Sequence, residues 1–298
     1  MGKQGDNGVR AMRKPRYRAP PGACDTHVHV FNRSAEELPA SVMANMPYGI
    51  PRAAGLVDLA AMHGQIGIER VVIVQTGANG TLDQFADFVA AVGPHARGVA
   101  RIDDSVTDAQ LDLLERAGVR GCRFNFVKFL RMRPPLDIVE RVARRLAERG
   151  WHMCAHLEPE DLLEVADFLE TLPIALVIDH LAHPRCEQGT KHPAFRRIVA
   201  WLEQGRVWAK IGNLDRWSKV GPPDYADAVP FIRETVHANP EQVIWCTDWP
   251  NLLYKNPYSP DGTLPDCGPL IDLLARAIDD ERLLQAILVD NPKRLYGF

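Results

Sequence analysis

The sequence predicts an α/β protein that folds as a single (β/α)8 barrel, and three observations support this. Short apolar runs rich in valine and isoleucine alternate with amphipathic stretches along most of the chain. There are eight such runs, the number of parallel strands that closes a barrel. The chain has 298 residues, which leaves room for a polar tail beside a barrel of typical size, roughly 250 residues.

The eight predicted strands are almost continuously apolar, as strands of a parallel sheet buried on both faces are. In chain order they are CDTHVHVF, RVVIVQT, ARGVARI, VRGCRFNF, WHMCAHL, IALVIDH, RVWAKIG and QVIWCTD. A doubly wound open sheet would have the same alternation, but a glycine-rich turn normally follows its first strand. None follows Val30, and the barrel is therefore favoured.

Between the strands lie segments whose apolar residues recur at spacings of three and four, which predicts helices with one buried face. The predicted helices are Leu82–Val92, Asp108–Ala117, Leu136–Arg149, Pro159–Leu169, Ala194–Glu203, Tyr225–His237 and a last one around Asp280–Val289. NPKRLYGF follows as a terminal cap. Residues 1–20 are polar, basic and proline-bearing, which predicts a flexible or surface-draped tail before a barrel of residues 21–298.

Composition and charge exclude several classes of protein. Hydrophobic residues make up 46% and charged residues 24%, as in an ordinary globular protein. The formal net charge is −3, whereas a general nucleic-acid binder is usually basic. The six cysteines stand singly, and no apolar run suits a signal peptide or a membrane span. We therefore expect reduced cysteines, a cytoplasmic location, and neither nucleic acid nor membrane as a partner, with the oligomeric state left open.

Polar residues interrupt the carboxyl ends of the predicted strands, where barrels carry their active sites. They are Asp25, His27, His29, His156, Asp179, His180, Thr247 and Asp248. Because side chains alternate along a strand, His27 and His29 point the same way. An H-x-H pair alone is equally typical of core histidines bonded to backbone carbonyls. Its interpretation therefore depends on the other residues.

Those other residues each have a structural alternative. His156 ends an apolar strand, where a lone histidine is more often a hydrogen-bonded core residue than a ligand. Asp248 is more informative, because a buried carboxylate needs a cation or hydrogen-bond donors, although a structural salt bridge would also satisfy it. Asp179 and His180 could cap the next helix, since neighbouring strand residues face opposite ways.

Three imidazoles and one carboxylate from three strands would form a donor set suited to a divalent metal ion. The predicted ligands are His27, His29, His156 and Asp248. Zinc and manganese are the candidate ions, because geometry rather than affinity usually decides the metal. An open coordination position would carry a water whose pKa falls toward about 7.

These motifs resemble the amidohydrolase superfamily, specifically its amidohydrolase-2 branch, over nearly all of the chain after residue 20. The resemblance rests on PPGACDTHVHVF, VRGCRFNFVK, LVIDH, KIGNLDR, VIWCTDWP and NPKRLYGF. Within the branch it points to the lactonases of 2-pyrone-4,6-dicarboxylate and of sulfomuconolactone. It implies a distorted (β/α)8 barrel.

The resemblance also implies the active-site residues. Its active-site positions correspond to His27, His29, His180 and Asp248, and its carboxylate-binding positions to Tyr48, Arg123 and Arg216. Where the pyrone lactonase has a second arginine just after the lysine of the strand-four motif, Lys128 is followed by Phe129, although Arg131 could replace it.

The position of His156 bears on the metal. A metal-independent lactonase of the branch has a tyrosine there, and metal-binding relatives have a histidine, so the resemblance favours a metal enzyme. A metal-free mechanism stays open, in which Asp248 is the general base and the histidines polarise the carbonyl.

The basic residues indicate the class of substrate. Arg123 and Lys128 are expected beyond strand four and Arg216 beyond strand seven, all on the catalytic face of the barrel. Guanidinium groups pair bidentately with carboxylates, which favours small rigid anions. Surface salt bridging is the alternative, which we assign to Arg116, Arg144 and Arg145 on helices.

The resemblance thus implies a hydrolase that opens the lactone of a small cyclic di- or tri-acid in aromatic-compound breakdown. Asp248 activates the water, and His180 stabilises the oxyanion beside the metal. The acid groups are held by Arg123, Arg216, Lys128 and Tyr48. Two alternatives remain: a metal-dependent decarboxylase of an unsaturated acid on the same scaffold, and a non-catalytic barrel that binds an anion.

Overall fold

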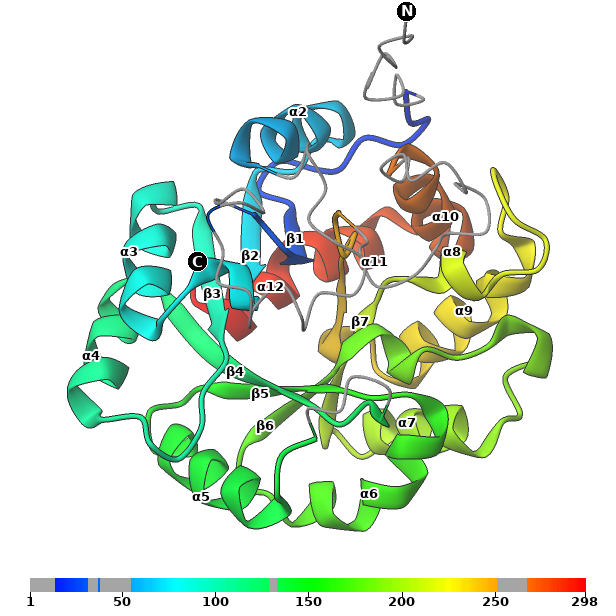
Figure 1. Ribbon diagram of the computed structural model, residues 1–298. Coiled ribbons are helices and arrows are strands. Elements are labelled where there is room, and N and C mark those ends of the chain that lie inside the picture. Colours follow the sequence, from blue (N-terminus) through cyan, green and yellow to red (C-terminus); the bar gives the residue numbers. More distant parts are fainter. Residues whose placement is uncertain (1–13, 32–36, 38–54, 129–132, 251–266) are drawn as a thin grey trace, which may run out of the picture.

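The computed structural model describes residues 14–31, 37, 55–128, 133–250 and 267–298. Eight parallel strands form one sheet in the order β1 to β8, with helices around it (Figure 1). The strands are β1 Cys24–Val28, β2 Arg70–Val74, β3 Ala96–Ala100, β4 Val119–Asn125, β5 His152–His156, β6 Ala175–Ile178, β7 Val207–Ile211 and β8 Val243–Trp245. The predicted (β/α)8 architecture is confirmed, and each strand lies within its predicted run.

The barrel closes between β8 and β1, at the carboxyl ends of both strands. The Thr26 hydroxyl donates to the carbonyl of Trp245 at 2.7 Å. Beyond β8, the Asp248 amide donates to the His27 carbonyl at 3.0 Å, and the His29 amide donates to the Trp249 carbonyl at 2.7 Å. Closing the barrel therefore brings the predicted site residues of its first and last strands together.

The helices follow the predicted alternation. They are α2 Leu56–Ile66, α3 Leu82–Val92, α4 Asp108–Arg116, α5 Leu136–Ala147, α6 Pro159–Thr171, α7 Pro193–Glu203, α8 Leu214–Trp217, α9 Val229–Ala238, α10 Gly268–Ile278, α11 Glu281–Gln285 and α12 Asn291–Tyr296. The bounds of α3 are as predicted, because the Thr81 side chain accepts from the Gln84 amide in a capping box. The predicted helices do not include α2 and α10.

Alternate strand residues fill the interior of the barrel. They form one apolar cluster: Cys24, Val72, Val74, Val99, Cys154, Val177, Trp208 and Ile244, joined by Tyr296. The residues between them face outward and pack against the helices in the larger core. This alternation decides which side chains can reach the barrel axis.

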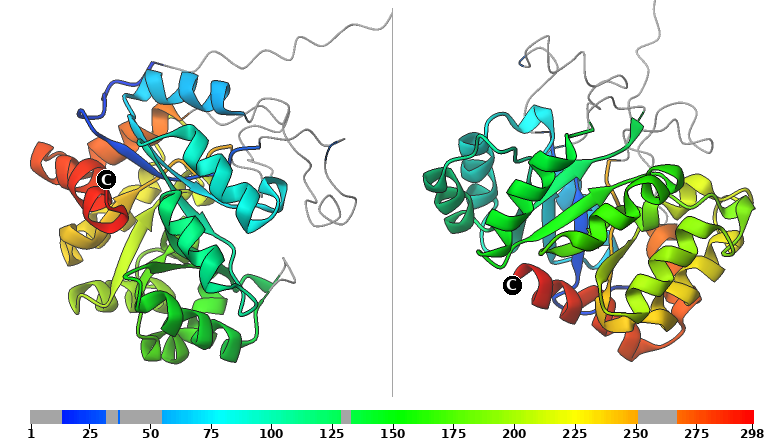
Figure 2. Two further views of the ribbon diagram at one scale, coloured as in Figure 1. Left: turned by 90° about the vertical axis from the view of Figure 1, so that its left-hand side faces the viewer. Right: turned by 90° about the horizontal axis from the view of Figure 1, so that it is seen from below.

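The C-terminal segment covers the amino end of the barrel, where the views of Figure 2 place α11 and α12. NPKRLY, predicted to follow the last helix, is itself helical. Pro292 lies just after a π-helical turn, Ala286–Asp290, that continues from α11 into α12. Tyr296 is fully buried, and its ring contacts the His152 ring edge-on with centroids 4.9 Å apart.

The predicted tail is described only from residue 14, and that part is attached to the barrel. The Arg16 and Tyr17 amides both donate to Asp272 of α10 at 2.8 Å. The Ala19 amide donates to the Ile66 carbonyl at 3.0 Å. Packing against the barrel therefore begins before the predicted boundary at residue 21. Within the described ranges, no helix combines the length and apolarity needed to cross a membrane.

Candidate active site

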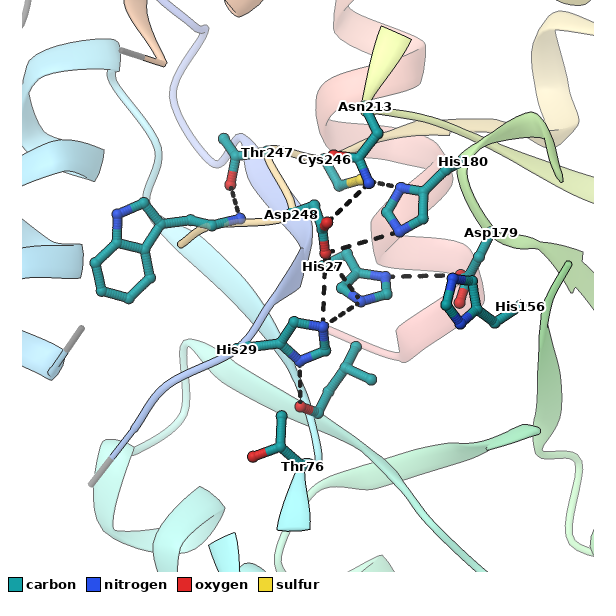
Figure 3. A network of polar contacts seen from close by, with 12 residues as sticks. His27, His29, Thr76, His156, Asp179, His180, Asn213, Cys246, Thr247 and Asp248 are labelled. Carbon is teal, nitrogen blue, oxygen red and sulfur yellow. Dashed lines mark hydrogen bonds and ion pairs between the residues drawn. The ribbon is translucent and has the colours of Figure 1, made fainter. Parts of the chain in front are cut away.

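At the carboxyl end of the barrel, three imidazoles surround one carboxylate oxygen (Figure 3). Asp248 Oδ1 lies 3.5 Å from the Nε2 atoms of both His27 and His29, and 3.7 Å from Nε2 of His180. The Nε2 atoms of His27 and His29 are 3.2 Å apart. All four side chains are buried. The structure thus brings these four predicted residues to one point.

Left-handed backbone aims two of these side chains. β6 ends at Ile178, and His180 follows in a short turn with a φ of 52°. The alternation of a strand no longer applies there, so Asp179 and His180 both face the barrel axis. Asp248 has a φ of 54°. A left-handed non-glycine residue costs of order 1 kcal/mol or more, and such residues cluster at functional sites.

The second oxygen of Asp248 is held by two donors from the segment after β7. Oδ2 accepts from Asn213 Nδ2 at 2.7 Å and from Arg216 Nη2 at 3.1 Å. Burial alone would raise the pKa of Asp248, but Arg216, followed by His27 and His29, brings it below the ordinary value. Asp248 is therefore a carboxylate at neutral pH, with Oδ1 turned toward the histidines.

A buried ion network supports the cluster from inside the barrel. Asp179 accepts from Lys210 Nζ at Oδ1 and from Arg123 Nε at Oδ2, each at 2.8 Å. Lys210 Nζ also lies 3.2 Å from Nδ1 of His27. Burial opposes both charges, but Asp179 holds the pKa of Lys210 well above its usual value, and Lys210 holds that of Asp179 well below. Lys210 was not predicted as a site residue, although a lysine inside the apolar run RVWAKIG is a signal.

His156, predicted as a metal ligand, contacts a histidine that the sequence analysis missed. Its Nε2 lies 3.2 Å from Nε2 of His183, and its Nδ1 lies 2.8 Å from Oδ1 of Asn125. The indole of Trp217 donates to Nδ1 of His183 at 3.4 Å. Because an indole N–H can only donate, neutral His183 carries its proton on Nε2 and donates it to His156. The Nε2 lone pair of His156 therefore accepts this hydrogen bond and is not free to bind a metal ion.

The histidines of the cluster are neutral at ordinary pH. Burial, with a further contribution from Lys210, lowers the pKa of His27 to about 3. Burial also lowers the pKa of His29, and it holds that of His180 well below the usual range. Neutral imidazoles can serve either as metal ligands or as hydrogen-bond donors and acceptors toward a substrate.

The basic residues predicted to bind acid groups lie in three different settings. Arg123 is within β4 rather than beyond it, and it reaches the cluster through Asp179. Arg216 is on α8 and contacts Asp248 directly. Lys128 instead makes an ion pair with Glu164 of α6 at 2.7 Å, with its side chain 65% exposed. Tyr48 lies outside the described residues.

The donor atoms of the cluster fit a divalent ion. Those of His27, His180 and Asp248 all lie within 4.8 Å of one another. Ligand atoms of a tetrahedral zinc site stand roughly 3.3 Å apart, close to the spacings of the cluster. His29 Nδ1 lies 2.9 Å from the Val74 carbonyl, to which it donates, so its Nε2 lone pair faces the cluster. His156 lies outside this group, its ring centroid 6.4 Å from that of His180.

The comparisons with known proteins agree with this architecture. The Amidohydrolase family (Amidohydro_2) matches residues 24–298. A 2-pyrone-4,6-dicarboxylate hydrolase from Comamonas testosteroni is 36% identical over 292 residues, covering 95% of this chain and 92% of that one. A 4-sulfomuconolactone hydrolase from Rhizobium radiobacter is 31% identical over 293 residues, covering 97% and 95%.

A solved structure extends the comparison to the fold. The crystal structure of an Agrobacterium tumefaciens protein superposes with a TM-score of 0.77 at 26% identity, covering 95% of this chain and 98% of that one. Sequence and structure therefore agree that this chain belongs to the Amidohydrolase family.

Proposed function

We propose that this protein is a hydrolase that opens the lactone ring of a small anionic cyclic ester during the breakdown of aromatic compounds. The observation that carries the proposal is Asp248, a buried carboxylate with one oxygen anchored and the other facing three neutral imidazoles. The names of the relatives support a substrate of the 2-pyrone-4,6-dicarboxylate or sulfomuconolactone kind.

In this proposal Asp248 is the general base and then the general acid. Oδ1 takes a proton from water as the water oxygen attacks the lactone carbonyl carbon. His180, with His27 beside it, stabilises the developing oxyanion. When the bond between the carbonyl carbon and the ring oxygen breaks, Asp248 returns the proton to that oxygen. Asn213 and Arg216 keep the carboxylate oriented through both steps.

The cofactor is a further part of the proposal. His27, His29, His180 and Asp248 would hold a divalent ion, zinc or manganese. When bound, it would polarise the lactone carbonyl and make water more acidic. His156 stays a predicted ligand, and it could bind an ion only after giving up its hydrogen bond with His183.

Arg123 and Arg216 are proposed to hold acid groups of the substrate, and Tyr48 remains a predicted contact. Lys128 would have to leave Glu164 to take part. We also propose a cytoplasmic location, which the six buried thiols support.

The test is an assay of anionic lactones, including 2-pyrone-4,6-dicarboxylate and sulfomuconolactone, with and without added zinc or manganese. We expect ring opening of at least one lactone, which is measured as the loss of lactone absorbance. The Asp248→Asn variant should lower kcat by about 10²–10⁴-fold, with the protein still folded by circular dichroism. Carbon dioxide release would instead identify a decarboxylase, and ligand-induced stabilisation without turnover would identify a binding protein.

A further inference from the structure

Two arginines stand at the same level on neighbouring strands of the barrel mouth. The ladder between β3 and β4 pairs Ala100 with Cys122. The next residues are Arg101 and Arg123, so their main chains are neighbours at the carboxyl end of the sheet. Arg101 is not among the acid-binding residues that the sequence predicts.

Arg101 is the first residue beyond β3, and continuing the alternation of that strand by one residue places it on the same face as Val99. Val99 belongs to the apolar cluster inside the barrel, and Arg101 follows it by two residues. Side chains two apart on a strand share a face. The Arg101 amide donates to Oε1 of Gln75 at 2.8 Å, which fixes the backbone as it leaves the strand. As a whole residue Arg101 is exposed, so a ligand can reach it, although part of its side chain is desolvated.

The acidic residues that follow Arg101 are engaged elsewhere. Asp103 accepts hydrogen bonds from Ser105, and Asp104 pairs with Arg141 at 2.6 Å. Within the residues that the structure describes, no carboxylate contacts the Arg101 guanidinium. Arg123 uses Nε for Asp179, and no described residue forms a hydrogen bond or ion pair with its two terminal nitrogens.

Two guanidinium groups side by side repel each other unless an anion lies between them. Desolvation, and then the positive charge of Arg123, lower the pKa of Arg101 from its ordinary value. An incoming carboxylate or sulfonate would relieve this repulsion and could accept hydrogen bonds from both groups. Arg216, after β7, lies across the barrel from β3 and β4. The mouth thus presents cations on two opposite sides.

We propose that Arg101 is a substrate-binding residue that, together with Arg123, receives one acid group of a rigid dianionic substrate. Arg216 faces the other side of the substrate ring. Arg101 binds the acid group that the sequence analysis assigned to Lys128. The kinetic test of this proposal rests on the proposed lactonase function, because it needs turnover of a lactone.

The kinetic test compares Arg101→Gln with wild type on a lactone with two acid groups and on one with a single acid group. For the dianion we expect KM to rise by about 10–100-fold, the value of a hydrogen-bonded charge pair, with kcat within about threefold. KM for the monoanion should change less than twofold, and Arg101→Lys should be intermediate. Arg144→Gln, which removes an equal charge from an exposed ion pair on α5, is the matched control.

A binding measurement separates this inference from the proposed function. Isophthalate and benzoate, unreactive acids with two and one carboxylates, are titrated calorimetrically into both proteins. Arg101→Gln should weaken isophthalate about tenfold or more and benzoate less than twofold, whether or not any lactone is hydrolysed. Equal weakening of both acids, no weakening of isophthalate, or the same effect from Arg144→Gln would overturn the assignment.

Discussion

The two ends of the barrel are built from the same strands and have opposite characters. At the carboxyl end, His27, His180 and Asp248 are buried polar groups, two of them on left-handed backbone. At the amino end, Tyr296 closes an apolar interior lined by cysteine, valine and isoleucine side chains and by Trp208. The comparison teaches that one strand can serve stability at its start and chemistry at its end.

Between the two ends lies the charged layer of Lys210, Asp179 and Arg123. It separates the apolar interior from the histidines and contacts His27 directly. Substitutions at the amino end should therefore change stability alone, and those in the charged layer should change stability and turnover together.

The largest expected loss of stability comes from the amino end. Tyr296→Ala removes a fully buried ring and should lower the free energy of unfolding by about 3–5 kcal/mol, measured by urea denaturation. In the folded protein kcat should stay within about twofold, because the cavity lies far from Asp248. Tyr296→Phe keeps the ring and loses only a hydroxyl that forms no hydrogen bond with a described residue, so it should change stability far less. A loss of turnover without a loss of stability would contradict the division.

The charged layer should give a smaller loss of stability together with a loss of turnover. Lys210→Met leaves Asp179 with one of its two cations and should lower the free energy of unfolding by about 3 kcal/mol. It should also lower kcat at least about tenfold, because His27 loses its neighbour at Nδ1. Lys219→Met breaks an exposed ion pair with Glu187 and should change stability by less than about 1 kcal/mol. Equal changes in the free energy of unfolding for the two substitutions would contradict a structural role for the buried charge of Lys210.

The smallest expected effect is a pH dependence from His152 at the amino end. Burial, and then Lys210, lower its pKa from 6.5 to about 3, so the folded protein holds it neutral. Its stabilising contribution is complete above pH 6.5 and is lost as the pH falls below that value, because the unfolded chain then binds a proton. Between pH 6.5 and 5.5 wild type should lose about 1 kcal/mol more than His152→Gln. The free energy of unfolding is measured by urea denaturation at both pH values. An equal loss in wild type and His152→Gln would refute this prediction.

The fold was largely predictable because each strand carries its own signal. Apolar runs of the right length fix the eight strands, and capping residues such as Thr81 fix where helices begin. The helices α2 and α10 are absent from the prediction, and α10 begins with a Gly-Pro pair that is more typical of a break. NPKRLY reads as a cap and is helical because a π-helical turn, Ala286–Asp290, joins α11 to α12 without a break.

The candidate site was predictable in part of its membership, without Lys210, His183 and Asn213, and not in its pairings. His27, His29, His180 and Asp248 follow from the residue types at strand ends, and the structure places them within contact of one another. His156 pairs with His183, and Lys128 pairs with Glu164. Such choices depend on distances between segments far apart in the chain, which no local pattern encodes.

The sequence by itself determined the barrel and the polar residues at its mouth, because the alternation of side chains along a strand is a local property. Only the tertiary structure decided how those residues meet. The left-handed turns at His180 and Asp248, the closure of β8 on β1 and the level of Arg101 beside Arg123 all arise when the sheet closes. Hydrogen bonds and ion pairs act over a few ångströms, so their partners are settled only once the strands are in register.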